Sequence, residues 1–85
     1  MIDPNQLRQR VRAVLAAAGR DQRLCEAYIH AALARFFPEP VPVPAMMEAL
    51  RFNADRGWAE KFWNDDEQRD EWQLTGRGRI KEGLA

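Results

Sequence analysis

The most informative segment of the sequence is WAEKFWNDDEQRDEWQL, residues 58–74. Two short runs rich in aromatic residues, WAEKFW and EWQL, flank the polar segment NDDEQRD. Aromatic side chains favour strands, and a polar segment between two such runs is typical of the turn of a hairpin. We therefore predict a β-hairpin over residues 58–74 with a long acidic tip, in which Lys61 and Arg69 pair with neighbouring carboxylates.

The residues after this hairpin predict a short final helix over residues 76–84, which Thr75 is suited to cap. The motif Arg77-Gly78-Arg79 has two interpretations. It begins this helix, or it resembles the core of an AT-hook, in which arginines enter the minor groove of DNA. An AT-hook carries proline beside that core, whereas glycine and isoleucine flank it here, so the structural role is favoured.

Three helices are predicted before the hairpin, each from apolar residues at helical spacing. The first covers residues 4–18 after Asp3, which is suited to cap it. The second covers residues 21–36, with Asp21 at its start, and the third covers residues 44–56 and ends at a glycine.

A proline-rich link over residues 37–43 separates the second and third helices. The stretch FFPEPVPVPAM contains four prolines, which forbid helix and favour an extended backbone. A binding motif of the PxxP type is one interpretation of this segment. A stiff connector is favoured, because Pro44 is well placed to begin the third helix.

The same periodicity predicts which side chains are buried. Arg8, Arg10 and Arg12 fall largely opposite the apolar positions of the first helix, which predicts a solvated face. His30 is expected on the exposed side of the second helix. The expected core comprises Leu15, Leu24, Tyr28, Ile29, Leu33, Met47, Leu50, Trp58 and Leu74.

Length and composition limit the class of protein. Residues 1–85 are expected to form one domain, and 46 % apolar with 31 % charged residues is typical of a globular chain. Thirteen basic residues balance thirteen acidic ones, whereas proteins that bind nucleic acid through charge usually carry a positive excess. No apolar run approaches the ~20 residues of a membrane span, so we expect a cytoplasmic location and no membrane partner.

Residues that carry catalysis or bind metals are scarce. The single cysteine, Cys25, excludes an internal disulfide, and no further cysteine or histidine joins Cys25 and His30 to complete a zinc site. Serine is absent and Thr75 is the only threonine. We therefore expect no enzymatic activity, no metal and no cofactor.

The order helix, helix, helix, hairpin, helix resembles a winged helix-turn-helix domain. MMEALRFNADRGWAEKFW (residues 46–63) is similar to a recognition helix that continues into the first wing strand, and DDEQRDEWQLTGRGR (residues 65–79) to a wing tip, returning strand and exit. The resemblance covers about residues 21 to 80 and extends to small winged-helix proteins of bacteria and Mu-like phages. It implies a mainly α fold with three helices, a two-stranded wing and a short C-terminal helix.

The resemblance implies one of two functions. The first is DNA binding of a bacterial or phage regulatory type, in which the third helix enters the major groove. The residues implied for DNA contact are Arg51, Asn53, Arg56, Arg77 and Arg79. The alternative is a protein–protein interaction module with an acidic wing, and its contact residues are Phe52, Phe62, Trp63, Asp65, Asp66 and Glu67. Candidate partners are thus double-stranded DNA, another protein, or a second copy of the chain in a homodimer.

Overall fold

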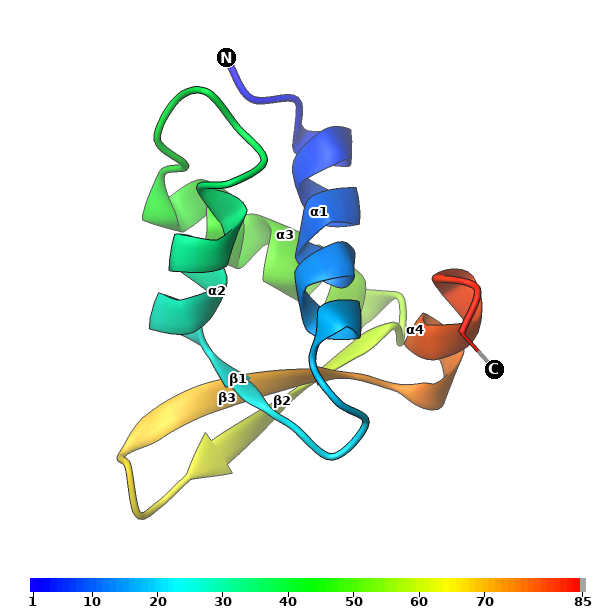
Figure 1. Cartoon of the computed structure of the whole chain (residues 1–85). Coiled ribbons are helices and arrows are strands. Elements are labelled where there is room, and N and C mark those ends of the chain that lie inside the picture. Colours follow the sequence, from blue (N-terminus) through cyan, green and yellow to red (C-terminus); the bar gives the residue numbers. More distant parts are fainter. Residues whose placement is uncertain (85) are drawn as a thin grey trace.

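Four helices and three strands make up residues 1–84, the part of the chain that the computed structural model describes (Figure 1). The strands form one antiparallel sheet in the order β1-β3-β2. Helices α1, α2 and α3 lie on one side of this sheet, and α4 lies beyond the end opposite the hairpin tip. The fold is therefore a small α+β domain. None of the helices in residues 1–84 has the length and apolar character needed to cross a membrane.

Helix α1, Pro4–Ala17, agrees with the expected helix to within one residue at its end. Asp3 accepts a hydrogen bond from the backbone N–H of Asn5 at 3.0 Å, and Pro4 occupies the first turn. Because the first N–H groups of a helix have no partner within it, this cap stabilises the start of α1.

The second predicted helix, residues 21–36, is wrong at its start. Leu24–Cys25 form strand β1, and α2 begins only at Glu26 and covers Glu26–Leu33. Strand β1 pairs with β3, where Leu24 lies opposite Trp72 and Cys25 opposite Glu71. The sheet thus has three strands where two were expected, since the open edge of the hairpin offers hydrogen bonds that outweigh an extra turn of helix.

The link between α2 and α3 is longer than expected. Helix α2 ends three residues early, because hydrogen bonds of the i to i−3 type from Arg35 and Phe36 tighten the chain into a turn. Helix α3 covers Val43–Asp55 after the extended Pro42, and so begins and ends one residue before the expected helix. His30 Nε2 lies 2.7 Å from the carbonyl of Val41, so His30 attaches the link to α2 and is no exposed bystander.

The hairpin is confirmed as strands β2, Ala59–Asn64, and β3, Arg69–Leu74. The expected ion pairs form along it, with Lys61 Nζ 3.9 Å from Asp70 and Arg69 Nε 3.1 Å from Glu71. Helix α4, Gly76–Lys81, ends three residues before the expected boundary. Its cap is confirmed, since Thr75 Oγ1 accepts a hydrogen bond from the backbone N–H of Gly78 at 3.0 Å.

The core lies between helices α1 to α3 and the face of β3 that carries Trp72 and Leu74. Most of the expected core residues are buried or half-buried, but Tyr28 is 59 % exposed. The buried apolar side chains are Leu7, Val11, Val14, Leu15, Ile29, Leu33, Val41, Met46, Ala49, Leu50, Ala59, Trp72 and Leu74.

Candidate functional site

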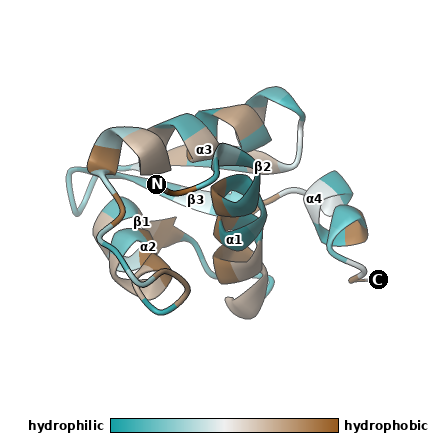
Figure 2. Cartoon of the chain, turned by 90° about the horizontal axis from the view of Figure 1, so that it is seen from above, coloured by the Kyte–Doolittle hydropathy of each residue, from teal (hydrophilic) through white to brown (hydrophobic). Residues whose placement is uncertain are grey.

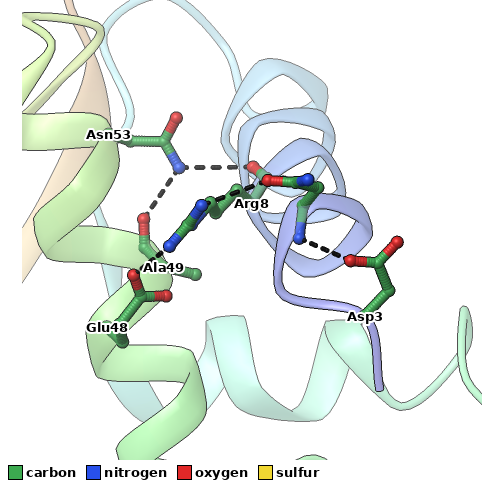
Figure 3. A network of polar contacts seen from close by, with 6 residues as sticks. Asp3, Arg8, Glu48, Ala49 and Asn53 are labelled. Carbon is green, nitrogen blue, oxygen red and sulfur yellow. Dashed lines mark hydrogen bonds and ion pairs between the residues drawn. The ribbon is translucent and has the colours of Figure 1, made fainter. Parts of the chain in front are cut away.

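Asn53, expected to contact DNA, is fully buried between α1 and α3 (Figure 3). Its amide nitrogen donates to the carbonyls of Arg8 at 3.2 Å and Ala49 at 2.8 Å. Its amide oxygen accepts from Arg12 Nη1 at 3.0 Å. Every polar group of this side chain is thus used inside the protein, so Asn53 has no group left for a base.

Arg12 belongs to the same buried network, which corrects the expectation of a solvated face on α1. Its side chain is buried, and its Nε donates to Glu82 at 3.2 Å while the guanidinium lies 4.9 Å from the ring of Trp58. An arginine can be buried in this way because its planar group satisfies two acceptors and stacks on an aromatic face.

Phe52 also lies in the junction of α1, α3 and α4. It is half-buried, and its ring centroid lies 6.3 Å from that of Trp58. Arg8 stacks 4.0 Å above Phe52 and is paired with Glu48 at 2.5 Å, and Arg56 lies 4.9 Å from the same ring. Phe52 is therefore enclosed by arginines, and sequence periodicity could not show that α1 supplies one of them.

The Arg77-Gly78-Arg79 motif is helical, and its central glycine is buried in the packing of α4. A Cβ at Gly78 would stand 1.9 Å from the carbonyl oxygen of Trp58, so only glycine fits there. The AT-hook interpretation is wrong, because the motif forms part of helix α4 and its central glycine packs against the backbone of Trp58. Arg77 is exposed beside Gly57, whereas Arg79 is half-buried.

The outward face of α3 carries little positive charge. Arg51 is exposed and is the only basic residue of the helix. Glu48 and Asp55 stand three residues before it and four after it, a spacing that places all three on one face. Of the five residues implied for DNA contact, Arg77 lies beside Gly57, whereas the guanidinium of Arg56 lies over the ring of Phe52. Arg51 stands on the face of α3 that also carries Glu48 and Asp55.

The hairpin tip carries three exposed carboxylates and one exposed aromatic side chain. Asp65, Asp66 and Glu67 are exposed, and none of them forms an ion pair within residues 1–84. Trp63 stands beside them with 57 % of its surface exposed and donates its Nε1–H to Asp65 at 3.3 Å. The turn is fixed by the backbone N–H of Glu67, which donates to the side chain of Asn64 at 3.1 Å.

A side-chain hydrogen bond joins the two strands at the base of the tip. Asn64 donates to Glu71 at 3.0 Å, and Arg69 Nε does so at 3.1 Å. These hydrogen bonds, that from Asn64 above all, outweigh burial and lower the pKa of Glu71. The guanidinium of Arg23 lies 3.6 Å from the ring of Phe62, so Phe62 is covered and Trp63 is left as the free aromatic of the hairpin.

A further surface, an apolar groove between α1 and α2, was missed by sequence reasoning. Tyr28 and Phe36 border it, and they are 59 % and 41 % exposed. Figure 2 shows apolar residues, coloured tan and brown, along both helices. The groove is lined by Ala13, Val14, Ala17, Ala18, Gln22, Leu24, Tyr28, Ala32, Arg35 and Phe36. The signal for it was the run of small residues at the end of α1, which leaves space for a partner.

Nothing within residues 1–84 gathers three or more His, Cys, Asp or Glu side chains in a way that could hold a metal ion. Cys25 is half-buried in β1, immediately before α2. Comparison with known proteins adds no assignment, because no protein-family model matches the chain and no curated protein matches its sequence.

Proposed function

We propose that the chain is a protein-interaction domain on a winged-helix scaffold, with the hairpin tip as its contact element. The order of three helices, hairpin and final helix supports this scaffold. The scaffold by itself does not select a partner, since one fold serves many functions. The choice between protein and DNA therefore depends on the surfaces.

The observation that carries the proposal is the exposure of Trp63 next to three carboxylates that form no ion pair within residues 1–84. Trp63 is 57 % exposed, and Asp65, Asp66 and Glu67 lie at the tip beyond it. Tryptophan is enriched among residues that dominate binding energy, because its large ring loses much apolar surface to a partner. Acidic residues around such an anchor favour a partner with a basic surface.

The charges of α3 and of the tip disfavour DNA as that partner. Phosphates would meet three exposed carboxylates at the tip. On α3 they would meet Arg51 between Asp55 and Glu48, and Glu48 is already paired with Arg8. The affinity of proteins for duplex DNA depends largely on cations that replace the counterions of the phosphates. A contact surface with more carboxylates than cations lacks this favourable contribution to the affinity for DNA.

Site-specific photo-crosslinking in cells that express the chain tests the proposal. A photoreactive amino acid at position 63 should crosslink to a discrete protein, and neutralisation by Asp65→Asn, Asp66→Asn and Glu67→Gln should abolish the product. The same amino acid in place of Val43, which is 53 % exposed on α3, is the matched control and should give no such product. Equal products from both positions, or none from position 63, would contradict the proposal.

DNA binding is the second candidate, and one observation favours it. Arg77 lies beside Gly57, the residue that follows the exposed Arg56, so exposed cations are available near the end of α3. A salt series with random duplex DNA tests this candidate. If DNA binds, Arg51→Ala with Arg56→Ala should reduce the salt slope by roughly one to two units.

The neutralised tip provides the sharper control for DNA. Neutralising Asp65, Asp66 and Glu67 should strengthen DNA binding by removing repulsion of phosphates. If neither the wild type nor this variant shows salt-dependent binding, DNA is eliminated as a partner.

A further inference from the structure

The groove between α1 and α2 and the hairpin tip are complementary in charge. Arg35 lines the groove, and the guanidinium of Arg10 lies 4.9 Å from the ring of Phe36 at its border. Both arginines are exposed, and neither forms an ion pair with a described carboxylate. The groove is thus apolar along its floor and positive at its rim, whereas the tip carries an exposed indole and three carboxylates.

The most exposed aromatic side chains of residues 1–84 are divided between these two surfaces. Tyr28 and Phe36 border the groove at 59 % and 41 % exposure, and Trp63 stands at the tip with 57 %. Other aromatic rings of the domain are covered by arginines or by the core. Exposed aromatic residues rimmed by charge mark surfaces that bind a partner.

We infer that the partner in the groove is the hairpin tip of a second copy of the chain. This inference deepens the proposed function and rests on it, since the tip is again the contact element. Trp63 of one copy packs between Tyr28 and Phe36 of the other, where each ring loses apolar surface. The carboxylates that flank Trp63 bind Arg10 and Arg35 through charge-assisted hydrogen bonds.

The same contact occurs twice in a symmetric dimer. Each copy contributes one tip and one groove, so a twofold axis repeats the contact and closes the assembly. The balance of charge is compatible with this arrangement, because thirteen basic and thirteen acidic residues give the chain a formal net charge of zero. Such a chain attracts its own copy without a net charge that would oppose association.

Sedimentation velocity over a range from low micromolar to millimolar concentration tests the inference. The wild-type chain should shift from monomer to dimer, and raised salt should weaken the dimer. Trp63→Ala and Tyr28→Ala should each raise the dissociation constant by about tenfold or more, as expected for central aromatic anchors. Circular dichroism should show that both variants remain folded.

Charge reversal gives a matched pair of variants. Arg10→Glu with Arg35→Glu makes the groove acidic, and Asp65→Lys, Asp66→Lys and Glu67→Lys make the tip basic. Each variant alone should be monomeric, because its tip and its groove then carry like charges. Mixed in equal amounts the two should form a heterodimer, because every tip again meets a groove of opposite charge.

Each outcome decides the inference. A wild type that remains monomeric at millimolar concentration overturns it, as does a dimer that both charge-reversed variants retain. If the chain is monomeric and position 63 still crosslinks to a different protein, the proposed function stands and only the identity of the partner is wrong. Failure of both experiments removes the tip as a contact element.

Discussion

The junction of α1, α3 and α4 and the hairpin tip use similar residues in opposite ways. In the junction, Arg12 donates hydrogen bonds to both Asn53 and Glu82 beside the ring of Trp58. At the tip, a tryptophan and three carboxylates face solvent without ion pairs in the described chain. Buried polar groups require partners inside the protein, whereas exposed ones remain available to another molecule. The junction therefore holds the fold together, and the tip is where binding should be sought.

We expect the most destabilising substitution at Gly78 in the junction. In Gly78→Ala the new Cβ would stand 1.9 Å from the carbonyl oxygen of Trp58 and 3.1 Å from a methyl group of Leu74. Since the carbonyl belongs to the backbone, it cannot turn away, and α4 must shift. We expect a loss of about 3 kcal/mol or more in the free energy of unfolding, measured by urea denaturation.

Gly76 is the matched control for this substitution. It lies in the same helix, and a Cβ there would meet nothing within 4 Å. Gly76→Ala should leave stability unchanged or raise it by about 0.4–1 kcal/mol, because alanine restricts the unfolded chain. Equal losses for the two variants would show that α4 does not pack on Trp58 as described.

Asn53→Ala should have the second largest effect. It removes the acceptor of the buried Arg12 Nη1, and it also removes a donor to the carbonyl of Arg8. Leaving buried polar groups unpaired should cost about 1–3 kcal/mol in urea denaturation. Arg51→Ala on the exposed side of the same helix should change stability by less than about 0.5 kcal/mol. A stable Asn53→Ala variant would mean that the network is dispensable.

Asn53 also shows where sequence reasoning reached its limit. Periodicity predicted the helix that contains it, and the structure places that helix within one residue of the expected bounds. The prediction that Asn53 faces DNA was wrong, because α1 covers this part of α3 and buries the amide. One sequence shows the repeat of a helix but not which neighbour lies against each face.

The start of α2 illustrates the same limit for local structure. Leu24 and Cys25 fit a helical stripe, but they pair with Trp72 and Glu71, which lie more than forty residues further along the chain. Long-range pairing overrides local propensity when an open strand edge is nearby. The hairpin itself was predictable, because its two strands and turn are adjacent in sequence.

The contribution of Glu71 at the base of the tip should depend on pH. Hydrogen bonds from Asn64 and Arg69 lower the pKa of Glu71 in the folded chain, so folding favours its ionised form. This stabilisation is present above the ordinary pKa of a glutamate and is lost as the pH falls through the lowered pKa. Glu71→Gln should therefore be less stable than the wild type at neutral pH, and the difference should narrow in acid.

Thermal unfolding at several pH values measures this difference. Glu60→Gln, an exposed site on the neighbouring strand, is the control and should follow the wild type throughout. A constant difference in unfolding temperature between Glu71→Gln and the wild type across the acid range would show that the charge of Glu71 does not contribute to stability. The difference would then reflect packing alone.

The smallest effect on stability is expected at the tip. Asp65→Asn, Asp66→Asn and Glu67→Gln together remove three charges that have no ion-pair partner within residues 1–84. Asparagine at position 65 keeps an oxygen to accept the hydrogen bond from Trp63. The free energy of unfolding should change by less than about 0.5 kcal/mol, measured by urea denaturation of dilute protein so that association does not contribute.

This null effect on stability is the condition under which the binding experiments can be interpreted. If the neutralised tip unfolds as the wild type does but no longer crosslinks or dimerises, the carboxylates act on a partner and not on the fold. A loss above about 1 kcal/mol would instead place these side chains among the structural groups, as in the junction. Because exposed like charges at a turn repel one another, a slight gain in stability at low salt would agree with our expectation.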